Sequence, residues 1–462
     1  MQLRRAVATG QAGEGSGLSR RVMIGTASML GARGFALVAS FVSIAIASRS
    51  LTPDAFGLWS ILSSFAFFAA TFDLGLGQGM RNRLAALAAR PGAEDEEQDL
   101  FFSVLYGLAL VAVVAIAAIV ILGRLMPWTS WLGAEQSELA DVVPLVATIV
   151  AALFVLNIPL NLNGPGFLAY QEAHRRSAFD VLQSAFLLVA VVTLAGNTSF
   201  VSFIASYYGL YDLVALVGLA FFIRSRRWSW PRVQWANVLA MVRPLLVSSL
   251  RFWLLGISAL LVFTTDPIIA ARVLGLAEAG DFSVVQKMFT VLITIHFTVL
   301  TPLWSAYTHA AENGDWPWID RAIKRSLTVT VLLVGLGAAL LVLFSRPILK
   351  LWVGREIEDL SLVIALAVWA STFAIANCYS VVLNGLNRIG RQTTFAVIGA
   401  MVNWPLSLWL GRRFGAQGII EGSIIVVLPT ALSNHLQVRA ILREKLNGAA
   451  GSESRAPDPR GA

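Results

Sequence analysis

Two similar stretches, IASRSLTPDAFG (46–57) and IAARVLGLAEAG (269–280), decide the fold, because each one ends a long apolar run and begins the next. Aligned without a gap, they share Ile, Ala, Arg, Leu and Gly at equivalent positions. These residues are common in this chain, so the match alone is weak. It becomes informative when the apolar runs between the two stretches are counted.

The composition places the chain among integral membrane proteins. Of its 462 residues, 57% are hydrophobic and 13% are charged, and its mean hydropathy is +0.71. A soluble protein carries about 25% charged residues. The single cysteine, Cys378, excludes a disulfide framework within the chain and a cysteine-based metal site. The formal charge of +8 does not predict nucleic-acid binding, because the basic residues are spread over short loops between apolar runs.

The chain contains twelve runs long and apolar enough to cross a bilayer as helices, since about 20 such residues span its core. The sequence therefore predicts an all-α integral membrane protein with about twelve transmembrane helices. The runs cover 21–47, 55–79, 101–123, 140–164, 178–196, 199–223, 240–264, 282–304, 322–345, 360–385, 391–410 and 415–437.

The orientation follows from the positions of Lys and Arg. An even number of spans puts both termini on one side of the membrane, and the loops on that side hold most of the Lys and Arg residues. The positive-inside rule makes that side cytoplasmic. The first twenty residues lack an apolar core followed by a cleavage site, so we expect the first span to be retained as a membrane anchor.

The repeat predicts two halves. The two opening stretches close the first and the seventh span, and the tripeptide LNG ends the fourth span (162–164) and the tenth (383–385). This spacing indicates two six-helix lobes in parallel orientation, related by an axis along the membrane normal, a plan common among transporters. The predicted organisation is a disordered cytoplasmic N-terminus (1–20), an N-terminal lobe (21–227), a C-terminal lobe (228–445) and a disordered cytoplasmic tail (446–462).

Charged residues inside the spans are candidate functional residues, because each costs about 2.5–3.5 kcal/mol to insert at a helix centre. Arg33 lies near the middle of the first span and Arg251 near the middle of the seventh. Two guanidinium groups facing one cavity would suit an anion with several oxygens. Alternatively, each pairs with a nearby acid or carbonyl and only holds helices together. Asp73 in the second span is the predicted partner of Arg33, in a salt bridge that opens when substrate arrives.

Three further polar residues are candidates for ion coupling or for lining the cavity. Asp212 in the sixth span is a candidate proton or sodium site, and an interhelical hydrogen bond is the alternative. His296 in the eighth span titrates near neutrality and is a second coupling candidate, although a packed histidine is the commoner case. Lys287, near the start of the eighth span, either lines the outer part of the cavity or extends to the interface.

Two segments predict broken helices. The fourth span ends with LNIPLNLNGPG (156–166), in which Pro159 interrupts the helix while Asn161 and Asn163 offer partners for the freed carbonyls. Asp266 and Pro267 form a similar break near the outer end of the seventh span. Interrupted helices often line substrate paths, and they also occur for packing alone.

Motifs for catalysis are missing from the sequence. It contains no Walker A pattern, no serine-nucleophile motif and no paired-carboxylate constellation. The run GLGQG (75–79) has no preceding strand, so it does not predict a nucleotide-binding loop. We therefore expect a protein that is not an enzyme and that has neither a cofactor nor a metal site.

Four blocks carry a family resemblance: LTPDAFGLWSI (51–61), DLGLGQGMRNRLA (73–85), TDPIIAARVLGLAEAGDFSVVQK (265–287) and PLWSAYTHAAENGD (302–315). With them the chain resembles the polysaccharide transporters, or oligosaccharide flippases, of the multidrug/oligosaccharidyl-lipid/polysaccharide exporter superfamily. The blocks cover the first two helices of each half. They are moderately specific for the family and say nothing about which sugar is carried.

The resemblance implies two six-helix lobes around a cavity lined mainly by the first, second, seventh and eighth spans. It implies a substrate as well, an oligosaccharide on polyprenyl pyrophosphate, moved from the cytoplasmic to the periplasmic leaflet of the bacterial inner membrane. The pathway would be lipopolysaccharide O-antigen, capsule or exopolysaccharide synthesis. Arg33, Arg251 and Lys287 are the positions that could hold the pyrophosphate, with Asp73 beside them. The implied partners are this lipid-linked oligosaccharide, membrane lipids, and a glycan polymerase or other assembly protein, but no nucleic acid.

The expected mechanism is alternating access, with the sugar and pyrophosphate in a polar cavity and the lipid tail in the bilayer, driven by a proton or sodium gradient. One alternative is an ion-coupled multidrug/cation antiporter of the same fold, against which the two arginines argue because they repel organic cations. The other is a non-transporting scaffold subunit of a glycan-assembly complex.

Overall fold

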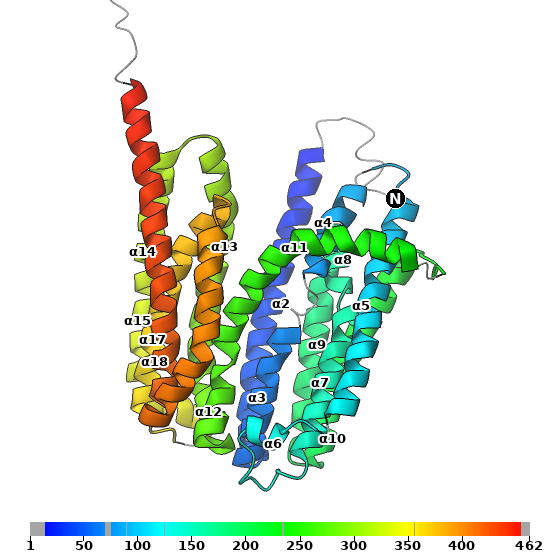
Figure 1. The fold of residues 1–462 in the computed structure, drawn as a ribbon, viewed down its shortest axis with the longest axis vertical. Coiled ribbons are helices and arrows are strands. Elements are labelled where there is room, and N and C mark those ends of the chain that lie inside the picture. Colours follow the sequence, from blue (N-terminus) through cyan, green and yellow to red (C-terminus); the bar gives the residue numbers. More distant parts are fainter. Residues whose placement is uncertain are drawn as a thin grey trace, which may run out of the picture. The chain divides into compact units, whose positions relative to one another are not determined.

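The computed structural model describes residues 14–69, 75–88, 90–123, 125–232, 235–354 and 356–453, and the regular elements within these ranges are all helices (Figure 1). Two compact units divide the chain, one comprising Met1–Ile257 with Gly275–Gly280 and the other Ser258–Leu274 with Asp281–Ala462. The division falls inside the helix Trp235–Thr264, whereas the predicted lobe boundary lies before it, at 227/228. The lobe boundary therefore stays a prediction.

The helix bounds follow in chain order. The first ten helices are α2 (Glu14–Ser50), α3 (Pro53–Ala69), α4 (Leu76–Ala88), α5 (Glu94–Leu122), α6 (Trp128–Trp131), α7 (Val143–Leu160), α8 (Asn163–Ala169), α9 (Ala173–Leu194), α10 (Phe200–Ser225) and α11 (Trp235–Thr264). The remaining elements are α12 (Asp266–Leu274), α13 (Leu276–Glu312), α14 (Trp316–Thr330), the π-helix η1 (Val331–Gly335), α15 (Leu336–Leu343), α16 (Ser345–Val353), α17 (Leu360–Gly385) and α18 (Gly390–Glu453).

Both repeated stretches contain a helix junction, as predicted. In the first copy α2 ends at Ser50 and α3 begins at Pro53, a residue suited to the first helical turn. In the second copy α12 ends at Leu274 and α13 begins at Leu276. Gly275 separates them with φ of +111°, which favours glycine because a side chain would be strained there.

The described helices confirm a multi-pass membrane protein, although the number of spans stays a prediction. Among the described residues, nine helices are long and apolar enough to cross a membrane. One of them, Gly390–Asn447, contains both of the last two predicted runs, with non-helical backbone at Gly415, where the second of these runs begins. The helices α3 and α11, which overlap the second and seventh predicted runs, are not among the nine.

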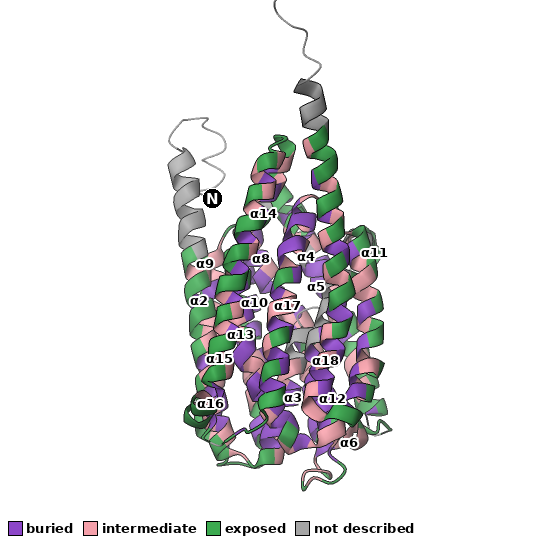
Figure 2. Ribbon diagram, turned by 90° about the vertical axis from the view of Figure 1, so that its left-hand side faces the viewer, coloured by how far each residue is buried: buried purple, intermediate pink, exposed green. Residues whose placement is uncertain are grey.

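The exposed surface of these helices is apolar, as expected for contact with lipid. On α5 the exposed side chains include Val113 at 65% and Ile121 at 70%. Buried and exposed residues alternate along the same helices in Figure 2. In water such a surface would promote aggregation, whereas in a bilayer it faces hydrocarbon.

Each unit has its own buried core. In the first unit, Met80 of α4, Phe101 of α5, Phe167 of α8 and Phe222 of α10 pack together with almost no exposed surface. In Figure 1, α4 and α8 lie at one end of that unit, whereas α6 lies at the other end. A single packed cluster therefore fixes the positions of four helices relative to one another.

The second unit is held by two clusters. The larger includes Tyr307 of α13, Ile319 of α14, Val382 of α17 and Val438 of α18. The smaller joins α11, α17 and α18, with Val262 packed against Val426 and Val427 and against Ala376. Large-to-small substitutions in such clusters typically cost about 2–5 kcal/mol.

Helix extends into both predicted disordered ends. The first helix begins at Glu14, inside the predicted N-terminal segment, and α18 continues to Glu453, inside the predicted tail. Leu, Lys, Glu and Ala near the end of α18 are good helix formers, and they continue a helix already nucleated by packing. Residues 1–13 and 454–462 lie outside the described residues.

Candidate functional site

Arg33 lies in the first unit on α2, the helix that packs against α9. Arg33 is exposed on α2, and its charge acts on Asp180 of α9. Asp180 also forms an ion pair with Arg176, whose Nε lies 3.0 Å from the carboxylate. Arg176 and Asp180 are one turn apart on α9, so the pair is set by helix geometry. Asp180 is therefore ion-paired with Arg176 and is influenced at longer range by the charge of Arg33.

The break between α7 and α8 positions Arg176. The helix α7 ends at Leu160, directly after Pro159, and α8 begins at Asn163, so the predicted break is present. Arg176 donates from Nη1 to Oδ1 of Asn161, 2.8 Å away, inside this break. A Cβ at Gly164 would overlap Nη1 of Arg176, so with alanine there the guanidinium would have to shift.

Asn163 is buried and stabilises the fold rather than facing a cavity. It is 2% exposed, and its Nδ2 donates to the carbonyl oxygens of Leu160 at 2.9 Å and Ala215 at 3.2 Å. The second bond ties α8 to α10. A buried amide with both bonds satisfied stabilises the break without being available to a ligand.

The first coupling candidate, Asp212, is a buried carboxyl on α10. It is 5% exposed, and Nδ2 of Asn157 on α7 donates to its Oδ1 at 2.8 Å. Its other oxygen, Oδ2, is buried and has no hydrogen-bond partner within the described residues. A charged carboxylate so placed would be costly; a bound proton would remove the charge, and a bound cation would give Oδ2 a partner.

A second buried carboxyl, Asp266, lies in the other unit at the predicted helix break. The helix α11 ends at Thr264, and α12 begins at Asp266, followed by Pro267. Oγ of Ser423 on α18 lies 3.1 Å from Oδ1 and 3.0 Å from Oδ2 of Asp266.

The polar groups around Asp266 form a small, closed network. Oγ of Ser423 also lies 3.1 Å from Oδ1 of Asn403, and Asn403 donates from Nδ2 to Oγ1 of Thr265 at 3.5 Å. Asp266, Asn403 and Ser423 are each at most 1% exposed. The pattern of the sequence indicated only a helix break here. The feature of the sequence that could have pointed to a functional carboxyl is an aspartate directly before a proline inside an apolar run.

The second coupling candidate, His296, is a packed histidine in the second unit. It is 1% exposed on α13, and its Nε2 lies 2.9 Å from Oγ1 of Thr330 on α14. Thr330 Oγ1 also lies 3.1 Å from Sγ of Cys378 on α17. Nδ1 of His296 is buried without a partner among the described residues. The π-helix η1 begins at the next residue, Val331, and such bulges occur frequently at functional sites.

The remaining candidates are only partly placed. Lys287 is half-buried on α13 in the second unit. Arg251 belongs to α11, but its side chain lies outside the described residues, and Asp73 lies outside them entirely. Their predicted roles, including the Arg33–Asp73 salt bridge, stay predictions. The sequence did not single out Arg176 and Asp180, whose spacing of four residues on a helix was the available signal.

Comparison with solved structures covers most of the chain. The solved structure of an inward-facing MATE family multidrug resistance transporter of the MOP superfamily has a TM-score of 0.70 at 14% identity, covering 89% of this chain and 96% of that one. The lipid II flippase MurJ in its inward closed conformation has a TM-score of 0.67 at 13% identity, covering 89% and 87%. At these identities the likeness establishes the fold.

Sequence comparison identifies the family. A Salmonella typhi protein named "Putative O-antigen transporter" is 20% identical over 396 residues, 83% of this chain and 88% of that protein. The sequence profile of the family described as "Polysaccharide biosynthesis protein" matches residues 22–308, more than half of the chain. The chain therefore belongs to the polysaccharide biosynthesis protein family.

Proposed function

We propose that the protein is a flippase that moves polyprenyl-pyrophosphate-linked oligosaccharides across the bacterial inner membrane by alternating access. The observation that carries this proposal is the family match, together with a relative named as an O-antigen transporter that aligns with 83% of the chain. The fold of the superfamily, shared with a lipid II flippase, supports the same substrate class.

The pyrophosphate binds at the cluster formed by Arg33, Arg176 and Asp180. In the free protein Asp180 is the ion-pair partner of Arg176, and the charge of Arg33 also acts on it. An arriving pyrophosphate carries more negative charge than one carboxylate and has several oxygens for the guanidinium groups, so it takes the place of Asp180. Arg251 and Lys287 are candidates for additional contacts.

The lipid tail stays in the bilayer while the head group crosses. Moving the sugar and pyrophosphate through hydrocarbon would leave many polar groups without hydrogen bonds, at several kcal/mol each. A polar path through the protein removes this cost. Both termini are cytoplasmic in this proposal, because the loops on their side hold most of the basic residues.

Coupling to a proton or sodium gradient takes place at the buried carboxyls. Asp212 has one buried oxygen without a partner, and Asp266 lies among the oxygen atoms of Ser423 and Asn403. Carboxylate, hydroxyl and amide oxygens are the ligands that hard cations prefer. Protonation would equally remove the cost of the buried charge.

Transport in proteoliposomes tests the proposed function. A fluorescent polyprenyl-pyrophosphate oligosaccharide is offered to the purified protein, and a cationic dye is offered in parallel. Movement of the lipid-linked sugar supports the flippase, movement of the dye alone indicates a cation antiporter of the same fold, and movement of neither indicates a scaffold subunit. A glycan polymerase or another assembly protein is the proposed protein partner.

A further inference from the structure

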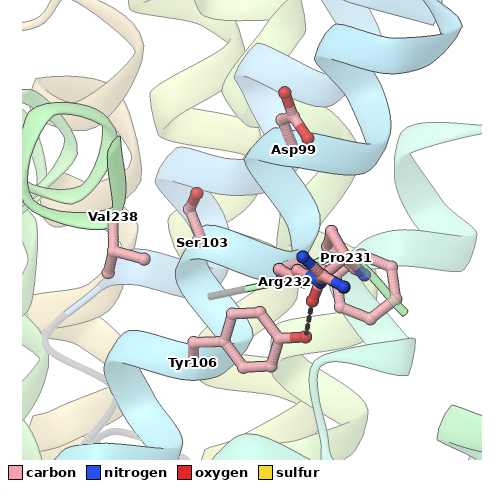
Figure 3. A pocket seen from close by; sticks show the side chains of 7 residues that line it. Asp99, Ser103, Tyr106, Pro231, Arg232 and Val238 are labelled. Carbon is pink, nitrogen blue, oxygen red and sulfur yellow. Dashed lines mark hydrogen bonds between the residues drawn. The ribbon is translucent and has the colours of Figure 1, made fainter. Parts of the chain in front are cut away.

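A polar cavity of about 190 Å³ lies in the first unit, beside the segment that connects α10 to α11 (Figure 3). One wall is the first part of α5, and the other is formed by Pro231, Arg232 and Val238. The lining residues are Asp99, Phe102, Ser103, Tyr106, Pro231, Arg232 and Val238.

The walls of this cavity are held in place by hydrogen bonds and rings. Asp99, Ser103 and Tyr106 lie three or four residues apart, so they share one face of α5. Tyr106 donates its hydroxyl to the carbonyl oxygen of Pro231 at 2.9 Å, which fixes the connecting segment against α5. Oγ of Ser103 lies 3.4 Å from the sulfur of Met241, which fixes the start of α11.

The cavity presents one acid and one base. Asp99 and Arg232 line it from the two different walls and are both exposed. Among the seven lining residues, all of which the structure describes, the bond drawn in Figure 3 joins Tyr106 to Pro231, and no bond joins Asp99 to Arg232. A ligand with an ammonium group and a phosphate group could therefore contact both charges.

The rim of the cavity is apolar and aromatic. Trp230 is 64% exposed, and its ring lies 5.0 Å from that of the lining residue Phe102, centre to centre. Trp235 and Leu239 are 48% and 68% exposed and lie one turn apart on α11, while Val238 is buried and lines the cavity. Exposed tryptophans beside basic residues are typical of helices that lie in the membrane interface.

We propose that this cavity binds the head group of a phospholipid that carries both an ammonium and a phosphate, as phosphatidylethanolamine does. The ammonium contacts Asp99, the phosphate contacts Arg232, and the acyl chains pass over Trp235 and Leu239. The cavity is smaller than the pockets of about 300–1,000 Å³ that hold drug-sized ligands. Its volume therefore suits a small polar group such as a lipid head group rather than a whole lipid.

The charges and the rim favour this lipid over other ligands. A purely anionic lipid would place its charge near Asp99 and gain only the contact with Arg232. A soluble phosphorylated amine would leave the exposed apolar rim without a partner. The bound lipid holds the segment that connects the two predicted six-helix halves. The proposal requires insertion in a membrane but does not depend on the transported substrate.

The test is native mass spectrometry of the full-length protein released from nanodiscs. The nanodiscs contain equal fractions of phosphatidylethanolamine, phosphatidylcholine and phosphatidylglycerol. We expect phosphatidylethanolamine to be retained about fivefold more than phosphatidylcholine, whose methylated ammonium cannot donate hydrogen bonds to Asp99. Soluble phosphoethanolamine, added in a separate arm, should not compete.

Variants assign the preference to the cavity. We expect Asp99→Asn to remove the preference for phosphatidylethanolamine while retaining phosphatidylglycerol, and Arg232→Gln to reduce both lipids. The matched controls are Asp95→Asn, one turn earlier on the same exposed helix end, and Arg224→Gln at the exposed end of α10. Neither control residue lines the cavity.

Two results would overturn the proposal. One is equal retention of phosphatidylethanolamine and phosphatidylcholine by the unmodified protein, a comparison that needs no variant to fold. The other is an unchanged preference in Asp99→Asn. Competition by soluble phosphoethanolamine would also contradict a lipid site and indicate a soluble ligand. Lipid retention is measured without transport, so a failure here is distinguishable from a failure of the flippase proposal.

Discussion

Gly57 and Gly280 occupy the same position in the two repeated stretches, and their backbones lie against each other. A Cβ built on Gly280 would lie 3.2 Å from Cα of Gly57. A Cβ on Gly57 would overlap the carbonyl oxygen of Leu276, in the same second stretch. Both glycines belong to the first unit, so the contact joins the two repeated stretches there, and the parallel repeat stays a prediction.

Alanine at Gly57 should disrupt this contact. Because the colliding atom is a backbone oxygen, the helix ends must move apart, and we expect a loss of about 1–3 kcal/mol in stability. The thermal unfolding midpoint of the purified protein in detergent measures this. Gly209→Ala on α10 is the control, because no atom lies within 4 Å of a Cβ there. Equal midpoints for the two variants would contradict the close contact.

The arginine cluster should decide binding of the anionic head group. Arg176→Ala removes the bonds to Asn161 and Asp180, so we expect at least tenfold weaker binding of a polyprenyl-pyrophosphate oligosaccharide. Arg176→Lys should restore charge but not the forked geometry, and its effect should be intermediate. Binding is measured by fluorescence quenching of the labelled ligand.

Asp180→Asn should have the opposite effect on binding. It removes the carboxylate that competes with the pyrophosphate for Arg33 and Arg176, so we expect tighter binding together with slower turnover, because release becomes harder. Affinity and transport rate are measured on the same preparation. Weaker binding in Asp180→Asn would indicate that the carboxylate contacts the substrate instead of competing with it.

The buried carboxyls should control coupling to an ion gradient. We expect Asp266→Asn to retain binding of the lipid-linked oligosaccharide but to lose stimulation of transport by an imposed proton or sodium gradient. Asp212→Asn, tested separately, assigns coupling to one unit or to both. Ser423→Ala, which removes the hydroxyl next to Asp266, should weaken a sodium response more than a proton response. Undiminished stimulation in both aspartate variants would exclude these carboxyls.

Arg226 should stabilise one end of the first unit. Its Nη2 lies 2.6 Å from Oε2 of Glu172, and its guanidinium lies 3.7 Å from the ring centre of Tyr170. The hydroxyl of Tyr170 donates to Oε2 of the buried Glu97 at 2.5 Å. We expect Arg226→Ala to cost about 1–2 kcal/mol, because its ion pair with Glu172 and its contact with the Tyr170 ring are lost, while Arg175 still pairs with Glu172 at 3.2 Å. The thermal midpoint checks the loss, and Arg224→Ala, an exposed neighbour, should leave it unchanged.

The fold was predictable because hydrophobic length and helix breaks are local signals. The junctions after Ser50 and Leu274, and the breaks around Pro159 and Asp266, all appear where the apolar runs are interrupted. The helical extension to Glu453 was not predicted. Composition alone does not indicate that a helix held by packing can continue into a polar sequence.

The site was less predictable because it depends on contacts between distant helices. Arg33 was singled out from its place in a span, but its relation to Asp180 on α9 requires the packing of α2 and α9. The partners of Asp266 lie more than a hundred residues away, at Asn403 and Ser423. Sequence spacing within one helix cannot indicate such a pairing.

The most direct measurement of the central claim is transbilayer movement of a fluorescent polyprenyl-pyrophosphate oligosaccharide in proteoliposomes. It compares the unmodified protein with the double variants Arg33→Ala/Arg251→Ala and Arg33→Ala/Arg176→Ala, with a cationic dye as the second substrate. We expect the lipid-linked sugar to move in the unmodified protein, both double variants to stall, and the dye to stay in place. Movement of the dye without movement of the sugar would contradict the flippase and leave only the fold.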